Sequence, residues 1–456
     1  MLQVLSHRIY RHLFLAQVTA LVGTGLTTIA LALLADSLAA GQAGIVLGTA
    51  LTIKMVAYVG IAPVAGAYAS RLPRRVLLVG LDLLRASVVC ALPFVTEVWQ
   101  IYVLIFLLNA ASASFTPIFQ ATIPDILEDE EQYTRALSLS RLAYDLENLL
   151  SPIAAAALLT VMSFDVLFLL NGLAFLGSAG LIISMALPTP HASDEAPGVW
   201  SRVSHGVKVY LKTPRLRGLL ALNMAVSAAG AMQIVNTVVY VRSTLGLGGQ
   251  AVAIAFAAAG GGSMMVALLL PKVLERARER PVMLFGGALM TLSLFLGLLA
   301  PGFVGLLGLW LLLGAGASMV MTPTGRLLKQ SCQPEDRPAL FAAQFSLSHG
   351  CWLLAYPLSG WFGAHVGLIE TFALLGTIAL VSTALSARFW PSRDSIHLEH
   401  DHSPGAHTHL HYHDEHHQHE HEGWEGSEPH RHPHHHPGGR HRHAFVIDRH
   451  HSQWPK

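Results

Sequence analysis

The sequence has little charge, few cysteines and no nucleotide-binding motif. Only 12% of its 456 residues are charged, whereas about 25% are charged in a typical soluble domain. Its net charge of +1 gives no reason to expect a nucleic-acid partner. Cys90, Cys332 and Cys351 form no CxxC pair, which argues against a disulfide framework and a thiolate metal site. Because a Gly-x-x-x-x-Gly-Lys-Ser/Thr motif is also missing, direct use of ATP is not expected, and nothing predicts an enzyme.

Long apolar stretches fill the chain before residue 390. Hydrophobic residues make up 52% of the sequence, and twelve stretches have the length and composition of membrane-spanning helices. We therefore predict an all-α membrane protein that crosses the lipid bilayer twelve times. The first stretch follows no cleavable signal pattern, so it is expected to remain as a helix. The predicted spans are residues 12–34, 43–67, 76–96, 100–120, 137–161, 165–187, 216–240, 250–270, 281–300, 302–324, 339–363 and 366–389.

Lys and Arg are concentrated in the connections on one side of these spans. The connection between the second and third spans contains Arg71, Arg74 and Arg75, and the other connections on that side are also basic. The opposite connections carry only Arg242. By the positive-inside rule, both termini are expected in the cytoplasm.

The spans divide into two related halves. The Thr-Pro pair at Pro117 recurs at Pro323, and a second proline, Pro152, recurs as Pro357 at nearly the same offset. Two parallel repeats of one six-helix unit would explain this pattern. The predicted organisation is an N-terminal half at 1–190, a cytoplasmic linker at 191–215, a C-terminal half at 216–390 and a tail at 391–456.

The tail holds 20 of the 26 histidines, all between His397 and His451. Imidazole is a common metal ligand, and without cysteine the chemistry favours Ni(II), Co(II), Zn(II) or Cu(II) over Cu(I). The tail is poor in apolar residues, so we expect it to be disordered when no metal is bound. A solvating tail and a purification tag are the alternatives, although a tag is usually one uninterrupted run. The candidate metal ligands are His407, His409, His411, His413, His416, His417, His419, His421, His430, His432, His434, His435 and His436.

Several polar residues fall inside the predicted spans, where a charge costs roughly 2.5–3.5 kcal/mol on insertion scales. In the fifth span Arg141 and Asp145 are four residues apart and can pair, and Asn148 continues the same face. Glu147 points about 200° away from Asp145. In the eleventh span, the repeat offset places His349 near the depth of Asp145 in the opposite half. We predict Asp145, Asn148, Glu147 and His349 along the substrate or proton path. The alternatives are a structural Arg141–Asp145 ion pair and a helix-packing histidine.

Four motifs resemble the Major Facilitator Superfamily. The stretch Gly-Ala-Tyr-Ala-Ser-Arg-Leu-Pro-Arg-Arg at 66–75 is similar to the loop signature of that family, and Leu-Asp-Leu-Leu-Arg-Ala at 81–86 follows at the expected place. Residues 115–125 and 135–140 resemble its drug and siderophore exporter branch. The resemblance covers about residues 10–390 and implies the family's fold. Within that branch, a long His-rich tail resembles the nickel-resistance permeases of bacteria, which implies location in the bacterial inner membrane.

The resemblance also implies a gating region at the cytoplasmic ends of the spans. The family loop usually has an Asp where this chain has Ser70, and that Asp helps to latch the cytoplasmic side. This chain therefore lacks the carboxylate of the usual latch. For Asp82 and Arg85 a static ion pair between helices is the alternative. The expected gating residues are Ser70, Arg71, Arg74, Asp82, Arg85 and Arg141.

These features together predict a secondary active exporter of a divalent metal cation. The resemblance favours Ni(II) as substrate and tail ligand, ahead of Co(II) and Zn(II), and proton antiport as the energy source. We expect a monomer whose partners are metal ions, protons and the bilayer, with no tightly bound cofactor. Two alternatives stay open: an exporter of drugs or siderophores with a metal-sensing tail, and a metal-buffering protein anchored in the membrane.

Overall fold

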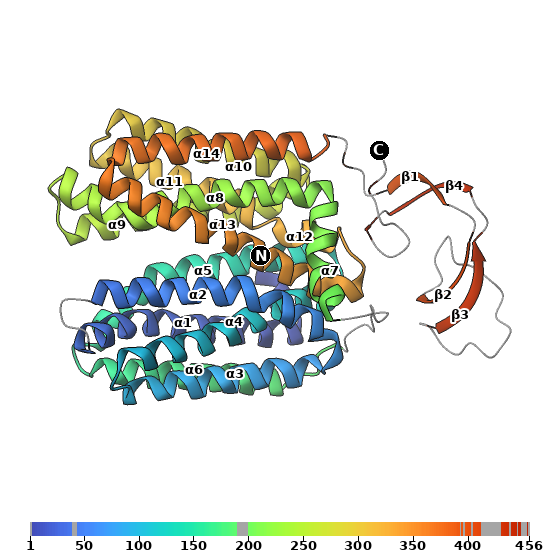
Figure 1. Cartoon of the computed structure of the whole chain (residues 1–456), viewed down its shortest axis with the longest axis horizontal. Coiled ribbons are helices and arrows are strands. Elements are labelled where there is room, and N and C mark those ends of the chain that lie inside the picture. Colours follow the sequence, from blue (N-terminus) through green and yellow to red (C-terminus); the bar gives the residue numbers. More distant parts are fainter. Residues whose placement is uncertain are drawn as a thin grey trace.

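The computed structural model is a helical bundle in two halves, with four short strands beyond one end (Figure 1). We call the end of the bundle that faces the strands the tail-side end. The structure describes residues 2–38, 43–188, 199–392, 394, 397–402, 405–411, 430–436, 439–444, 446–447 and 454.

The N-terminal half consists of α1 to α6, which form where the sequence has long apolar runs. Polar side chains fix two of the helix starts. Glu97 and Gln100 form a reciprocal capping box at the start of α4, and the carboxylate of Asp129 accepts a hydrogen bond of 2.8 Å from the backbone N–H of Gln132 in α5. The helices are α1 (Arg8–Leu38), α2 (Ala43–Tyr68), α3 (Arg74–Ala91), α4 (Val98–Ile126), α5 (Glu130–Leu158) and α6 (Phe164–Ile183).

The C-terminal half consists of α8 to α14. α8 begins with Pro214 in its first turn, where the missing N–H of proline costs no helix hydrogen bond. Two glycines allow α9 and α11 to pack closely. A Cβ at Gly262 would lie 2.0 Å from the carbonyl oxygen of Leu311, and one at Gly314 would lie 1.9 Å from that of Ala259. The helices are α8 (Pro214–Val239), α9 (Gly249–Leu274), α10 (Glu279–Leu296), α11 (Phe303–Met321), α12 (Thr324–Lys329), α13 (Arg337–His365) and α14 (Leu368–Phe389).

Each of the twelve predicted spans falls on one long helix. Among the described residues, ten of these helices are long and apolar enough to cross a bilayer. α5 and α13 are outside this set, so their crossing of the bilayer stays a prediction. Large apolar side chains cover the outside of the bundle; Val304, Leu299 and Leu173 are 82%, 76% and 62% exposed. Such a surface suits lipid rather than water, and the chain is a multi-pass membrane protein.

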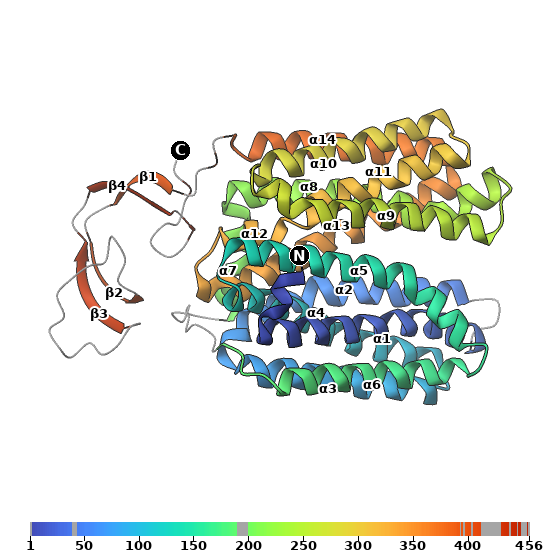
Figure 2. The same ribbon diagram turned by 180° about the vertical axis from the view of Figure 1, so that it is seen from behind.

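The two halves meet along α5 and α13. α5 packs against α9, and α13 packs against α2 and α4. Figure 2 shows α5 beside the opposite half, with α1, α3 and α6 on the far side of its own half. The predicted linker contains a helix, α7 (Val199–Lys212), which contacts α2 and α13 and so touches both halves.

The tail differs from the expectation of a disordered chain in the four segments that form strands. β1 (His397–His402) pairs antiparallel with β4 (Gly439–Ala444), and β2 (Gly405–His411) pairs antiparallel with β3 (His430–His436). The register places His407, His409 and His411 opposite His434, His432 and His430. Histidine at every second position, as at 407, 409 and 411, is compatible with the two-residue repeat of a strand. The candidate ligands His413, His416, His417, His419 and His421 lie outside the described residues.

Candidate functional site

Asp125, near the tail-side end of α4, binds two arginines from distant parts of the chain. Its Oδ2 lies 2.5 Å from Nη1 of Arg74 at the start of α3, and its Oδ1 pairs with Nη1 of Arg337 at the start of α13. The side chains of Arg74 and Asp125 are each only 2% exposed. Because α13 belongs to the C-terminal half, this buried carboxylate joins the halves.

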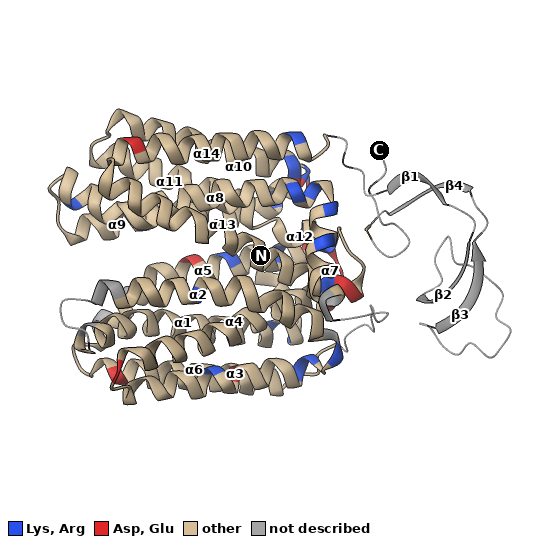
Figure 3. Cartoon of the chain, in the orientation of Figure 1, with Lys and Arg blue, Asp and Glu red and all other residues tan. Residues whose placement is uncertain are grey.

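Arg326 in α12 makes a second connection between the halves. Its Nη2 lies 2.6 Å from Oε1 of Glu130 in α5, and its Nε lies 2.8 Å from Oε1 of Glu279 in α10. Nζ of Lys329 donates to the backbone carbonyl of Glu128 at 2.7 Å. Figure 3 shows that Lys and Arg gather toward this end of the bundle. The tail-side end is therefore closed by charged contacts between the halves.

The linker helix α7 adds to this closure. Nε2 of His205 lies 3.0 Å from Oδ1 of Asp336, and the hydroxyl of Tyr210 donates to Oε1 of Gln344 in α13 at 2.5 Å. Burial raises the pKa of Tyr210 well above its ordinary value, so its hydroxyl keeps the proton that it donates. These contacts bind the linker to the C-terminal half.

Two of the predicted gating residues lie at this end. Arg74 takes part in the closure, and the guanidinium carbon of Arg71 lies 5.3 Å from the centre of the Tyr68 ring. Asp125 and Arg337 were not predicted from the sequence as gating residues. Their only signal is an acidic residue at the end of the fourth span and a basic residue at the start of the eleventh.

Asp82 and Arg85 form a buried ion pair inside the N-terminal half. Nη2 of Arg85 pairs with Oδ1 of Asp82, and the Ser178 hydroxyl donates to Oδ2 of Asp82 at 2.8 Å. The guanidinium carbon of Arg85 also lies 3.9 Å from the centre of the Phe115 ring. All these partners belong to α3, α4 and α6, so the structure does not bring this pair to the contacts between the halves. The side chain of Ser70 lies outside the described residues.

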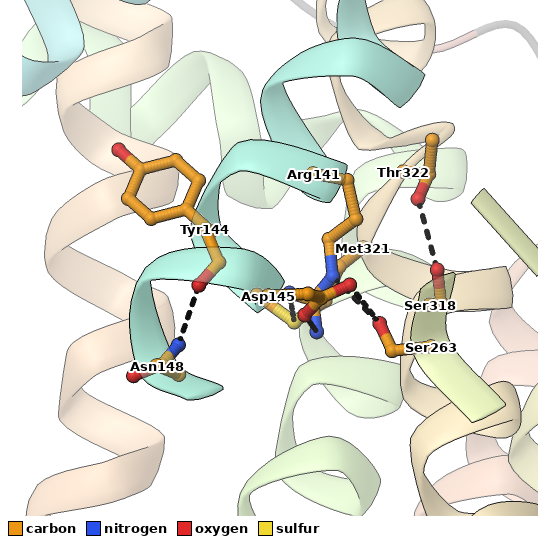
Figure 4. Close-up of polar contacts among 8 residues, drawn as sticks. All are labelled: Arg141, Tyr144, Asp145, Asn148, Ser263, Ser318, Met321 and Thr322. Carbon is orange, nitrogen blue, oxygen red and sulfur yellow. Dashed lines mark hydrogen bonds and ion pairs between the residues drawn. The ribbon is translucent and has the colours of Figure 1, made fainter. Parts of the chain in front are cut away.

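Arg141 and Asp145 make a polar contact from α5 to the opposite half (Figure 4). Nη2 of Arg141 lies 3.0 Å from Oδ1 of Asp145, as the helical spacing predicted. The hydroxyl of Ser263 in α9 donates to Oδ2 of Asp145 at 2.6 Å and accepts from Nε of Arg141 at 3.0 Å. Nη1 of Arg141 also contacts the sulfur of Met321 at 3.3 Å. Asn148 is exposed, and its amide donates to the backbone of its own helix at 2.9 Å.

Glu147 lies on a different face of α5 and has different neighbours. A Cβ at Gly25 in α1 would lie 2.8 Å from Oε1 of Glu147, so the carboxyl group reaches α1. Ser151 is its hydrogen-bond partner, and Lys54 of α2 lies within electrostatic range. Glu147 is therefore an acid near a base, away from the Arg141–Asp145 pair.

His349 projects from α13 toward α2. Its Nδ1 lies 2.7 Å from the carbonyl oxygen of Phe345. A carbonyl only accepts hydrogen bonds, so Nδ1 carries the proton and Nε2 of the neutral ring keeps a lone pair. The ring centre lies 4.8 Å from that of Tyr58, and Lys54 acts electrostatically on His349 as it does on Glu147. His349 and Glu147 are therefore both within electrostatic range of one lysine, Lys54.

We call Lys54, Tyr58, Glu147 and His349 the central polar cluster. The structure does not bring Asp145 to His349, because these residues pack against α9 and α2 respectively. Tyr58 was not predicted as a member of a site, whereas Lys54 is a lysine in an apolar span, which is a signal in itself. The cluster offers a carboxylate and an imidazole, which can both hold protons or donate lone pairs to a cation.

Within the described part of the chain, no three His, Cys, Asp or Glu side chains lie close enough together to hold a metal ion. Cys332, between α12 and α13, is buried, and burial raises the pKa of its thiol. A neutral thiol is a poor metal ligand. Among the described residues, the central polar cluster therefore lacks the three ligands of a closed metal site.

An apolar groove runs between α1 and α5, with a volume of about 550 Å³. Val18 and Val22 of α1 and Leu146 and Leu150 of α5 are among its lining residues. Glu147 also lines it, so the groove and the central polar cluster share one carboxylate.

The sequence matches the family described as "Major Facilitator Superfamily" over residues 13–280 and 231–411. The chain is 24% identical over 342 residues to the uncharacterized MFS-type transporter YfiS of Bacillus subtilis (strain 168), covering 70% of this chain and 79% of that protein. It is also 27% identical over 135 residues to macrolide efflux protein A of Streptococcus pyogenes, covering 27% of this chain and 33% of that protein.

Two solved structures have the same fold. The human organic anion transporter MFSD10 (TETRAN) superimposes with a TM-score of 0.72 at 12% identity, covering 83% of this chain and 99% of that one. A bacterial homologue of the iron transporter ferroportin in an outward-facing state superimposes with a TM-score of 0.69 at 14% identity, covering 84% and 99%.

Proposed function

The chain belongs to the Major Facilitator Superfamily, and on that premise we propose that it exports a divalent metal cation, Ni(II) first, from the cytoplasm by proton antiport. The observation that carries the proposal is the density of histidines in the tail, 20 of 26 within residues 397–451, on a membrane transporter with efflux-type relatives. Imidazole binds Ni(II), Co(II) and Zn(II), and a tail with this density has no use in an apolar core.

The orientation follows from charge. The connections at the tail-side end are the basic ones, and by the positive-inside rule this supports a cytoplasmic position for that end. The resemblance to bacterial nickel-resistance permeases supports the inner membrane as its location. The tail then gathers metal on the side where an exporter loads. The ion pairs of Asp125 and Arg326 close that side. Loading requires that they break, and alternating access then moves the cargo between the two sides.

Proton coupling is assigned to the central polar cluster. Glu147 and the free Nε2 of His349 can each hold either a proton or a cation, and protons that enter from outside displace the metal from such ligands. Lys54 favours release of a cation because like charges repel. Asp145 has a positioning role instead, because Arg141 and Ser263 already engage both of its oxygens.

Export of organic molecules is the second candidate. The apolar groove between α1 and α5 supports it, since it offers a surface for an apolar molecule and one carboxylate for a positive group. Part of the chain is also similar to a macrolide efflux protein. In this reading the tail regulates transport rather than feeding it.

Cells that express the full chain test these readings directly. We expect these cells to show a large increase in tolerance to nickel and smaller increases in tolerance to cobalt, zinc and copper. Their tolerance to a macrolide should be unchanged. Macrolide tolerance that survives removal of the tail would replace the proposal by the second candidate. A protein that only buffers metal would instead raise cellular nickel content, because its spans would serve as an anchor and would not lower the internal concentration.

A further inference from the structure

The apolar groove between α1 and α5 opens on the outer side of the bundle. Two residues of its α5 wall, Leu146 and Leu150, are 38% and 52% exposed. They point about 100° and 140° away from Asp145, which faces α9. Tyr144 turns about 100° the other way and lies within electrostatic range of Tyr58 in α2. The groove and the interior of the bundle are therefore on opposite sides of α5, and lipid is the solvent that the groove meets.

The groove is about as deep as one leaflet of a bilayer. Along α1, which lies beside α5 in Figure 2, it runs from Phe14 to Leu26. Twelve helical steps span about 18 Å, and one leaflet contributes about half of the roughly 30 Å hydrocarbon core. The two helices close on each other near the inner end, because a Cβ at Gly25 would lie 2.0 Å from Oγ of Ser151. A single acyl chain from the tail-side leaflet therefore fits the groove and ends near Glu147.

Two arginines continue the walls of the groove toward the tail-side end. Arg11 precedes the lining residue Phe14 by three positions on α1, and it is exposed. Arg135 precedes the lining residue Leu139 by four positions on α5. Residues three or four apart share a helix face, so both arginines stand one turn beyond the apolar lining. This is the level at which the headgroup of a lipid lies when its chain fills the groove.

The two arginines also meet at one place. The short 3-10 helix η1 (Leu2–Ser6) packs against both α1 and α5. Nη1 of Arg11 donates to the backbone carbonyl of Leu5 at 3.4 Å, and Nη1 of Arg135 donates to Oε1 of Gln3 at 3.1 Å. Two cations from different helices are thus brought to the mouth of one groove.

The acid at this mouth is a weak competitor for an anion. Glu131 pairs with Arg135, but the Glu131 side chain is 51% exposed, and exposed pairs of this kind contribute little. The contact of Arg11 is to a neutral carbonyl. Guanidinium groups bind phosphate with paired, charge-assisted hydrogen bonds, so a phosphate group can engage both arginines.

We propose that the groove binds one acyl chain of an anionic phospholipid from the leaflet at the tail-side end, with the lipid phosphate between Arg11 and Arg135. The apolar walls and the depth of one leaflet select the chain, and the paired cations select the headgroup. A zwitterionic lipid carries the same phosphate together with a cation that the arginines repel, so it binds more weakly. The site goes beyond the proposed function and does not depend on which cargo the protein carries.

Binding of phosphatidylglycerol to the full-length protein in detergent tests the site. Native mass spectrometry over a series of lipid concentrations gives the occupancy and the Kd, and phosphatidylcholine with the same acyl chains is the comparison lipid. Arg11→Gln removes one cation from the mouth. Its matched control is Arg217→Gln, which removes an exposed arginine near the start of α8 in the other half.

A second pair of variants tests the groove itself. Val22→Trp fills the groove from its α1 wall, where Val22 is 53% exposed and a larger side chain meets no core residue. Its matched control is Val304→Trp on the outside of the C-terminal half, at a position that is 82% exposed. Leu150→Trp fills the same groove from the α5 wall and replaces Val22→Trp if that variant has a lower Tm.

We expect the wild type to hold one phosphatidylglycerol about tenfold more tightly than phosphatidylcholine. Arg11→Gln and Val22→Trp should each weaken the binding of phosphatidylglycerol about tenfold, because one loses a charge-assisted contact and the other loses the space for the chain. Both controls should keep the wild-type Kd. Equal affinity for the two lipids would overturn the anionic headgroup. A wild-type Kd in Arg11→Gln would overturn the position of the phosphate, and a wild-type Kd in the groove-filling variant would overturn the groove as the place of the chain.

Discussion

Asp145 and Glu147 are two positions apart on α5, yet their surroundings differ. Arg141 and Ser263 engage the carboxylate of Asp145, which makes it part of a contact between the halves. Glu147 lies within electrostatic range of Lys54, and we propose that it holds an exchangeable proton or cation. A helix turns about 100° per residue, so Asp145 and Glu147, two positions apart, point about 200° away from each other and meet different neighbours.

Glu147→Gln is expected to abolish proton-driven Ni(II) transport while the protein keeps its expression level and its Tm. The amide keeps the size of the side chain and removes the exchangeable proton. Transport assays in vesicles, with Tm measured on the same preparations, check this. Asp145→Asn is expected to lower Tm by several degrees, because Arg141 loses its partner inside an apolar helix. A stable Glu147→Gln protein with wild-type flux would remove Glu147 from the mechanism.

His349→Ala is expected to reduce Ni(II) flux at least tenfold with little change in Tm, because it removes a lone pair from the central polar cluster. His365→Ala is the matched control. It lies on the same helix and makes the same contact to a carbonyl four residues earlier, at 3.0 Å, but it is exposed. Equal flux in the two variants would make His349 a packing residue.

Contacts between residues one helical turn apart were predicted from the sequence, whereas contacts between residues far apart in the sequence were not. The Arg141–Asp145 pair was predicted from its spacing and is confirmed. Ser263, which completes the contact, lies 118 residues away from Asp145, and no spacing rule connects them. Lys54 and His349 likewise meet only because α2 packs against α13.

At the scale of the helices, polar contacts mark the boundary between the halves. α5 and α13 each pack against the opposite half, and Asp145 of α5 and Arg337 of α13 each bind a side chain across the boundary. A helix in this position must leave and rejoin its partner during alternating access, and polar contacts re-form more readily in water than a large apolar interface does. Hydropathy alone predicted where the helices lie; it did not predict which of them meet.

Asp125→Asn should weaken the closure of the tail-side end. It leaves Arg74 and Arg337 without their carboxylate, and removing one partner from a buried ion pair costs about 3–5 kcal/mol. We expect a lower Tm and faster labelling of cysteines introduced at the tail-side end. Glu131→Gln is the control, because Glu131 is half exposed where it pairs with Arg135, and such pairs contribute about 0–1 kcal/mol. Equal effects of the two substitutions would contradict a closure built on Asp125.

A peptide of residues 397–451 should bind several Ni(II) ions at pH 7.5 and release them below about pH 5.5. Free imidazoles have a pKa of roughly 6.5, so the metal-binding form is dominant above that pH and lost as pH falls through it. Calorimetry at the two pH values measures this. Absence of binding heat at pH 7.5 would remove the tail from the account.

The tail shows where composition misleads. A polar, His-rich sequence predicted disorder, but the structure pairs β2 with β3 and β1 with β4. The packing of Ile447 and Trp454 against the C-terminal half was not predicted either, because these are isolated apolar residues whose partners lie far away in the sequence.

At the scale of the whole molecule, positive charge, the closing ion pairs and the histidines share one end. Figure 1 shows the strands beyond that end, and Figure 3 shows the basic residues gathered toward it. An exporter needs this asymmetry, since it must collect a dilute cargo on one side and keep that side closed while it releases the cargo on the other. The asymmetry has two sources: the two halves supply the closing ion pairs, and the tail supplies the histidines at the same end.

Truncation after Arg393 is expected to lower nickel resistance without abolishing it. The deletion removes every tail histidine and leaves all the long helices, and the tail raises local metal concentration but cannot cross the bilayer itself. Growth assays at matched protein levels measure the effect. Complete loss of resistance with normal protein levels would make the tail an obligatory part of the path.

Transport of Ni(II) into inside-out vesicles tests the central claim most directly. Vesicles that contain the wild-type protein and are acidic inside should accumulate Ni(II), and protons should leave the vesicles as the metal enters. This uptake should stop when the pH gradient is collapsed. Vesicles with Glu147→Gln should accumulate none, and those with Glu370→Gln, an exposed acid at the start of α14, should behave as wild type. Wild-type vesicles that take up a macrolide but no Ni(II) would contradict the account.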